Sequence, residues 1–98
     1  MKNIYEINAL LQESGESVEF HLSISRPLLS LEGNDYYCKV HCPILFENDK
    51  DIYGVDEAQA KELAVEFAIR MLRGRRLVDM DAKFIDLERS LRAFLNRA

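Results

Sequence analysis

Two cysteines and two histidines are the residues of this 98-residue chain whose types could support nucleophilic catalysis. A thiol enzyme needs a base within hydrogen-bonding reach of the sulfur, and a third group that orients the base. Cys38, His41 and Cys42 belong to one alternating segment, which places both sulfurs on one side of a strand and the imidazole on the other. His21 likewise points away from its apolar neighbours. We therefore expect buried thiols and exposed histidines, with no catalytic residue among them.

A metal site has weak support from the same residues. Cys38 and Cys42 are four positions apart, whereas zinc sites combine closer pairs with a second ligand pair elsewhere. On a strand this spacing is about 13 Å, beyond the roughly 7 Å that a disulfide can bridge. A calcium loop is the other metal hypothesis, but the glycine of its sixth position is missing. Its carboxylates would be Glu47, Asp49, Asp51 and Asp56. We interpret them as a polar loop that ends in a helix cap, and we expect no metal and no cofactor.

Arginines form the densest local group of charge. The group consists of Arg70, Arg73, Arg75 and Arg76, and the residues Arg89, Arg92 and Arg97 of a later segment could extend it. Guanidinium groups bind phosphates and acidic protein surfaces, so this cluster is a candidate partner-binding site. Arginines near a helix end also complement the helix dipole, and a pI near 5.1 is far from the values of nucleic-acid-binding domains. Tyr37 joins the candidates, because tyrosine and arginine are enriched in binding hot spots.

Two alternating segments must position these side chains. Residues 18–25 and 36–42 each place apolar residues on one side only, which predicts two strands with one buried face. Arg26-Pro27 ends the first strand, and a turn at residues 33–35 favours antiparallel pairing with the second. Residues 44–46 predict a continuation of that strand or a bulged edge, and residues 47–51 predict a loop. The first dozen residues fit a helix or the first arm of a hairpin, and we favour the strand.

One long helix has both of its ends marked in the sequence. Asp56 can cap the first turn, with Gln59 three positions later, and Gly74 suits the position just after the last turn. The predicted buried stripe consists of Ala60, Leu63, Ala64, Phe67, Ala68, Met71 and Leu72. After a short link at residues 77–82, a second amphipathic helix is predicted from the spacing of Phe84, Leu87, Leu91 and Phe94 or Leu95. A core this small has little surface to cover the second stripe, so we expect a homodimer.

Composition and charge bound the class of protein. The length predicts one domain over residues 1–98, and 48% hydrophobic with 31% charged residues is ordinary for a soluble protein. No segment reaches the roughly 18 apolar residues of a membrane span, and the start lacks the apolar region of a signal peptide, so we expect a cytoplasmic protein. Residues 1–69 hold 5 basic and 13 acidic side chains, whereas residues 70–98 hold 8 and 4. This asymmetry predicts an oriented electrostatic surface.

Three runs of residues resemble a small bacterial α+β domain family of unknown function. They are Ser25-Arg26-Pro27, Asp35-Tyr36-Tyr37-Cys38 and Tyr53-Gly54-Val55-Asp56-Glu57-Ala58-Gln59-Ala60. In that family a similar Gly-Val-Asp-x-x-Gln-Ala helix start follows an antiparallel meander. The resemblance covers about residues 4–73. It implies the fold and a bacterial source, and it implies no activity or catalytic residue.

The predicted fold is therefore α+β, with an antiparallel β-meander of about three strands packed on one long amphipathic helix, plus a C-terminal helix. The favoured function is a non-catalytic bacterial interaction protein, which acts as an adaptor, regulator or inhibitor of a protein partner and forms a homodimer. One alternative is a nucleic-acid-binding module that uses the arginine cluster. Another is a small enzyme or ligand binder with a pocket that the sequence does not reveal.

Overall fold

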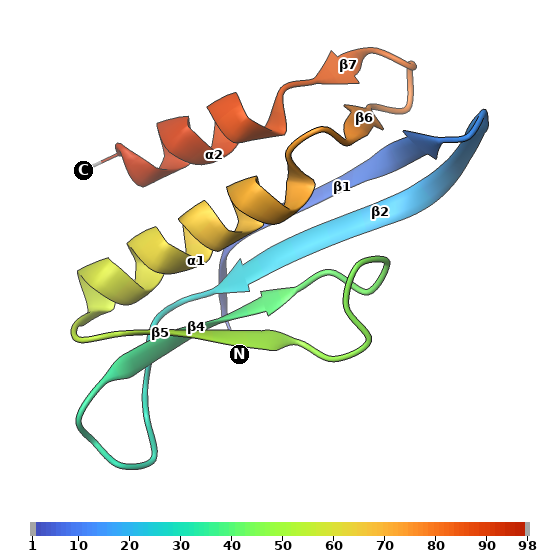
Figure 1. Cartoon of the computed structure of the whole chain (residues 1–98). Coiled ribbons are helices and arrows are strands. Elements are labelled where there is room, and N and C mark those ends of the chain that lie inside the picture. Colours follow the sequence, from blue (N-terminus) through green and yellow to red (C-terminus); the bar gives the residue numbers. More distant parts are fainter. Residues whose placement is uncertain (1, 98) are drawn as a thin grey trace.

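Two helices lie against one face of an antiparallel sheet in the computed structural model, which describes residues 2–97 (Figure 1). The elements are β1 (Asn3–Glu13), β2 (Glu16–Ser25), β3 (Leu28–Leu29), β4 (Tyr36–His41), β5 (Lys50–Gly54), α1 (Glu57–Leu72), β6 (Arg76–Val78), β7 (Phe84–Ile85) and α2 (Leu87–Leu95). The α+β class and the antiparallel sheet are confirmed. The prediction of about three strands is wrong, because the described residues form seven.

The long β1–β2 hairpin forms the middle of the sheet. Ser14 and Gly15 connect its arms with φ angles of 52° and 79°, and Glu13 pairs with Glu16 across the turn. Positive φ at both central residues is typical of the tight hairpin turns whose twist matches that of the strands. The strand that we favoured for the first dozen residues is confirmed. β6 continues the sheet beside β1, and β4 continues it beside β2.

β4 has partners on both of its edges. β2 and then β3 run along one edge, where Ile24 pairs with Val40, while β5 runs along the other. The predicted antiparallel pairing of the two alternating segments is confirmed. Between β2 and β3 the ladder is interrupted at Arg26-Pro27, where proline cannot donate. The hydroxyl of Ser25 accepts from the Lys39 amide at 2.8 Å, so this buried donor stays satisfied.

Several local predictions between the long elements are wrong. Residues 44–46 do not continue β4, because the amides of Leu45 and Phe46 both donate to the Cys42 carbonyl and form a turn. β5 begins at Lys50, inside the loop that we predicted to reach position 51, β6 covers the first two residues of the predicted link, and β7 occupies the predicted start of the second helix. These strands have two to five residues each. Segments so short show little periodicity, and their pairing depends on strands that are distant in sequence.

α1 begins and ends where the sequence predicts. The Asp56 carboxylate accepts from the Gln59 amide at 2.8 Å, and the Gln59 side chain accepts in turn from the Val55 amide at 2.7 Å. Gly74 follows the last turn with a φ angle of 85°. These contacts satisfy backbone groups that an α-helix cannot pair internally.

The buried face of α1 is rotated from the predicted stripe. Leu63 and Met71 are 41% and 39% exposed, whereas Val65 and Ile69 are buried. The cause is α2, which packs beside α1 and covers the side of Val65 and Ile69. A single-helix amphipathic pattern cannot reveal on which side a second helix will pack.

α2 is shorter than predicted, and the chain itself covers its apolar side. Asp86 caps it by accepting from the Arg89 amide at 3.1 Å, and Phe84 lies outside it in β7, 62% exposed. Leu87 and Leu91 are buried. The predicted reason for a homodimer, an uncovered stripe on this helix, is therefore wrong. Neither helix of residues 2–97 is long and apolar enough to cross a membrane.

Candidate functional site

The two thiols lie inside the core and the two imidazoles lie outside it, as predicted. Cys38 and Cys42 are buried, on the face of β4 that the helices cover. Burial raises the pKa of the Cys38 thiol to about 11, and it raises the pKa of the Cys42 thiol as well. The reactive species of a cysteine is the thiolate, which such burial disfavours. These cysteines are packing residues, and the chemistry of the chain has to be sought on the opposite face.

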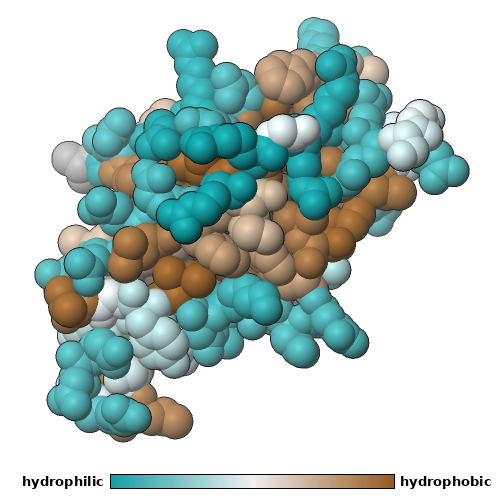
Figure 2. All heavy atoms as spheres, in the orientation of Figure 1, coloured by the Kyte–Doolittle hydropathy of each residue, from teal (hydrophilic) through white to brown (hydrophobic). Residues whose placement is uncertain are grey.

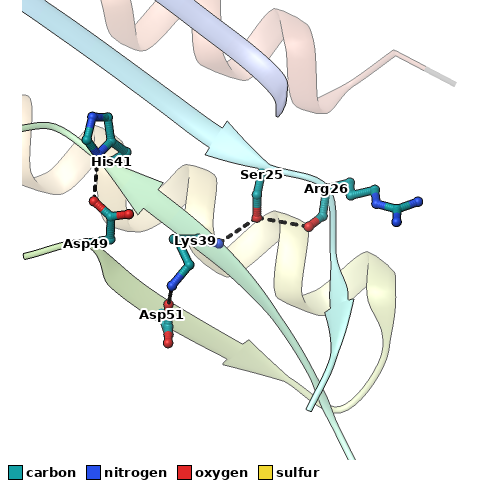
Figure 3. A network of polar contacts seen from close by, with 6 residues as sticks. All are labelled: Ser25, Arg26, Lys39, His41, Asp49 and Asp51. Atoms are coloured by element: carbon teal, nitrogen blue, oxygen red, sulfur yellow. Dashed lines mark hydrogen bonds and ion pairs between the residues drawn. The ribbon is translucent and has the colours of Figure 1, made fainter. Parts of the chain in front are cut away.

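The uncovered face of β4 and β5 carries paired polar side chains (Figure 3). Lys39 lies directly opposite Asp51 in the ladder, and its ammonium is 2.8 Å from the carboxylate. One step along, the Nδ1 atom of His41 is 2.6 Å from the carboxylate of Asp49. The first pair joins β4 to β5, and the second joins β4 to the loop just before β5. Cross-strand pairs on one face stabilise a sheet locally.

Polar side chains continue on the outer face from His41 toward the β1–β2 hairpin. The rings of His21 and His41 are 5.7 Å apart in an edge-on arrangement, and the Nδ1 atom of His21 is 2.7 Å from the Asn8 side-chain oxygen. Asp49, His41, His21 and Asn8 thus form a row that crosses the outer face. Neither imidazole lies near a thiol, because both cysteines point through the sheet to the other side.

At the other end of β4, two tyrosine rings pack against each other on the same outer face, with their planes tilted by 37°. The rings of Tyr37 and Tyr53 are 5.3 Å apart, and Tyr53 is 50% exposed. They border a hollow of about 450 Å³, to which Asp35, Asp51 and Glu32 add carboxylates. The Lys39 ammonium is 5.9 Å from the centre of the Tyr37 ring. A hollow with aromatic walls and an acidic rim suits a cationic side chain of a binding partner. We call it the tyrosine hollow.

Tyr37 was predicted as a contact residue and Tyr53 was not, because the segment before α1 was predicted as a loop that only leads to the helix. A signal for the pairing was nevertheless present. Aromatic, basic and basic residues stand at 37, 39 and 41, and acidic, acidic and aromatic residues stand at 49, 51 and 53. A hairpin that pairs 39 with 51 brings each base opposite an acid and each tyrosine opposite a tyrosine.

Three of the four arginines of the predicted cluster contact other side chains of the same chain. Arg73 is 3.6 Å from Glu88 of α2, and Arg75 is 2.8 Å from Glu13 of β1. Arg76 donates to the Gln12 side chain at 3.0 Å. Among the described residues only Arg70 of the four has no ion pair or side-chain hydrogen bond. The other three connect the end of α1 and β6 to their neighbours.

Three of the four carboxylates of the calcium hypothesis also contact groups within the chain. Asp49 contacts His41, Asp51 contacts Lys39, and Asp56 caps α1. Within residues 2–97 no group of three or more histidines, cysteines or acidic residues is arranged to hold a metal ion.

The arginines of α2 also differ in whether their side chains have a partner within the described residues. Arg92 binds Glu88 and Glu66, and these hydrogen bonds raise the pKa of its guanidinium above the usual value. Arg89 lies on the exposed side of α2.

Comparisons of the chain with protein-family models, curated proteins and solved structures give no match.

Proposed function

We propose that this protein is a non-catalytic interaction protein, an adaptor, regulator or inhibitor that binds a partner protein through its uncovered sheet face. The observation that carries the proposal is the tyrosine hollow, where two tilted tyrosine rings border a concave surface that also carries the carboxylates of Glu32 and Asp35. Tyrosine side chains supply large contact areas at a small cost in conformational entropy, which makes the exposed Tyr53 and the half-buried Tyr37 suitable anchors. The complementary partner carries lysine or arginine side chains.

The charge of the chain supports the same class of partner. The net charge is −4, and residues 1–69, which include the tyrosine hollow, hold most of the acidic side chains. Opposite charge on a partner accelerates encounter and excludes acidic competitors. The proposal places the protein in the cytoplasm, where cysteines such as Cys38 and Cys42 stay reduced. The resemblance implies that the cell is bacterial.

Nucleic-acid binding, the alternative from sequence, has weaker support. Arg73 and Arg75 are already neutralised by glutamates, and Arg76 is bound to Gln12, so few guanidinium groups remain for phosphates. The other alternative, a small-ligand binder, would use the same tyrosine hollow. It would bind a small molecule there instead of a protein.

Site-specific photocrosslinking tests the proposal. A photoreactive phenylalanine analogue replaces Tyr53, and in a matched control it replaces Arg89, which is exposed on the helix side. In bacterial cells we expect a discrete protein adduct at position 53 that is absent at position 89. Its yield should fall when Tyr37→Ala is added, while Leu29→Ala, another exposed position, should leave it unchanged.

The identified partner is then purified and titrated against the protein. We expect a loss of affinity of at least about tenfold for Tyr37→Ala, and weaker binding as the salt concentration rises. Equal adducts at positions 53 and 89, or an affinity that does not depend on Tyr37, would refute the proposal.

A further inference from the structure

The histidines of β2 and β4 are neighbours on the outer face of the sheet. Ser23 pairs with His41 in the ladder, and His21 precedes Ser23 by two residues, so the two imidazoles are diagonal neighbours on one face. Their ring centres are 5.7 Å apart, and both side chains are partly exposed. We call His21 and His41 the histidine pair. In the view of Figure 2, polar side chains cover much of the surface around an apolar middle. The proposed function uses neither histidine.

Hydrogen bonds set the tautomer of both rings. The Nδ1 atom of His21 is 2.7 Å from the Asn8 side-chain oxygen. The Nδ1 atom of His41 is 2.6 Å from the Asp49 carboxylate (Figure 3). An amide or carboxylate oxygen can only accept, so both Nδ1 atoms donate, and the Nε2 atom of each neutral ring keeps a free lone pair. Histidines that bind metals show this arrangement, in which the other ring nitrogen donates to an oxygen that fixes the ring.

The separation of the two rings suits one metal ion between them. An ion that one nitrogen of each ring holds at about 2.1 Å, near the tetrahedral angle, keeps the ring centres roughly 5 to 6 Å apart. The observed separation of 5.7 Å lies within that range. The ring planes are inclined by 66°, so the rings are not stacked face to face. The backbone therefore already provides the spacing that a shared ion requires.

The surroundings of the histidine pair favour a cation. His21 and Glu19 line a hollow of about 390 Å³, and the exposed Glu19 carboxylate attracts positive ions to it. Lys39, two positions before His41, is 2.8 Å from the carboxylate of Asp51 and is neutralised by it. The charges beside the two rings therefore do not oppose the approach of a metal ion.

We propose that the histidine pair binds one divalent ion of nickel, copper or zinc, the metals that imidazole suits, through both Nε2 atoms. Asn8 and Asp49 orient the rings, and water fills the remaining coordination positions. Among residues 2–97 no third imidazole, thiol or carboxylate is placed to complete the ligand set. The site is therefore a two-histidine site that is open to solvent.

The ion links two strands that share only a short ladder. β2 and β4 pair at two positions, whereas β1 and β2 pair along most of their length. An ion held by both β2 and β4 binds the folded chain and so stabilises it. The site goes beyond the proposed function and is independent of it, because the tyrosine hollow lies at the other end of β4. Loss of metal binding would leave crosslinking at Tyr53 unchanged, and the reverse also holds.

Calorimetric titration with Ni²⁺ and with Zn²⁺ at pH 7.5 tests the site. The chain carries no polyhistidine tag, and the cysteines do not compete because they are buried. We expect one ion per chain for each metal and no binding of Mg²⁺, which prefers oxygen ligands. His21→Ala and His41→Ala should each weaken binding by at least about tenfold, because one imidazole remains.

The residues that orient the rings give a second set of variants. Asn8→Ala and Asp49→Ala should each weaken binding of Ni²⁺ by about tenfold or more, although neither side chain touches the ion. The matched controls are Asn34→Ala and Glu47→Ala, at exposed positions outside the row, and they should leave the affinity unchanged. Circular dichroism establishes that each variant is folded.

Imidazole ¹⁵N spectra identify the atoms that bind the ion. With Zn²⁺ we expect the Nε2 resonances of both histidines to shift while both Nδ1 atoms keep their protons. Thermal unfolding measures the link between the strands. Zn²⁺ at a hundredfold excess over its dissociation constant should raise the midpoint by at least about 5 °C, and it should not do so in the double variant His21→Ala with His41→Ala.

Four results would each overturn the proposal. They are the absence of binding at millimolar Ni²⁺ and Zn²⁺, binding that persists in the double variant, a shift of only one histidine, and an unfolding midpoint that Zn²⁺ does not raise.

Discussion

At the scale of single residues, the side of a strand on which a residue falls decides its chemistry. Cys38 and Lys39 are neighbours, yet the thiol is buried in the core and the ammonium contacts Asp51 on the outer face. Burial raises the pKa of the thiol to about 11, because a thiolate in apolar surroundings loses its hydration. Alternation along β4, visible in the sequence, was sufficient to predict this separation.

The raised pKa of Cys38 predicts how stability depends on pH. The unfolded chain loses the thiol proton near pH 9.0, whereas the folded chain holds it to about pH 11. Between these values the unfolded state binds fewer protons, so the free energy of unfolding falls as the pH rises, by roughly 2 to 3 kcal/mol. Below pH 9 this residue contributes no pH dependence. Urea unfolding from pH 8 to 11 measures the effect, and Cys38→Ala should reduce the slope. An unchanged slope in that variant would show that Cys38 is not its source.

The cap at Asp56 leads to a second prediction at this scale. Asp56→Ala removes the acceptor of the Gln59 amide and should lower the free energy of unfolding by about 1 kcal/mol. Asp56→Ser keeps an acceptor and should stay within a few tenths of a kcal/mol of the wild type. Chemical denaturation distinguishes the two. Equal losses in both variants would mean that the charge of Asp56, rather than its hydrogen bond, stabilises the helix start.

At the scale of elements, the β4–β5 hairpin and α1 form one unit. Gly54 ends β5 directly beneath the first turn of α1, and an added Cβ atom would lie only 2.4 Å from the Ala60 backbone nitrogen. The strand and the helix can approach this closely because position 54 carries no side chain. The same hairpin holds Tyr37 and Tyr53, so the helix start and the tyrosine hollow are built on the two faces of one strand pair.

This close approach predicts an unequal effect of two glycine substitutions. Gly54→Ala should displace α1 from β5 and lower the free energy of unfolding by about 3 kcal/mol, since backbone atoms cannot rotate away. Gly33→Ala has no atom within 4 Å of the new Cβ and meets only the strain of a φ angle of +77°. It should cost about 1 kcal/mol. Thermal unfolding of both variants measures the difference, and equal losses would contradict the packing described for Gly54.

At the scale of the whole molecule, both helices cover one sheet face and leave the other to polar pairs. Leu11, Phe20, Leu22 and Val40 lie beneath the helices, whereas the row from Asn8 to Asp49 faces outward. The sheet has long strands at its centre and short ones near its ends. Stability should therefore be distributed unevenly, because short strands bury few groups.

Hydrogen exchange measures that distribution. Amides of β1 and β2, which have partners on both sides, should exchange by global unfolding and be the slowest. Amides of β3 and β7, with two residues each, should exchange by local opening at least about a hundredfold faster. Uniform protection across the sheet would indicate that the short strands are more firmly held than their length implies.

The sequence by itself determined the features that depend on neighbours in the chain. The cap at Asp56, the stop at Gly74, the alternation around Cys38 and the outward position of Tyr37 follow from local hydrogen bonding and side-chain periodicity, which a few residues contain. The tertiary structure alone decided which side of α1 is buried, where β5 to β7 pair, and how the arginines are neutralised. Each of these depends on segments that meet only after folding: α2 beside α1, Tyr53 opposite Tyr37, and Glu13 beside Arg75. No pattern within one segment specifies the position of another, because short strands and surface charges form whichever contacts the long elements bring within reach.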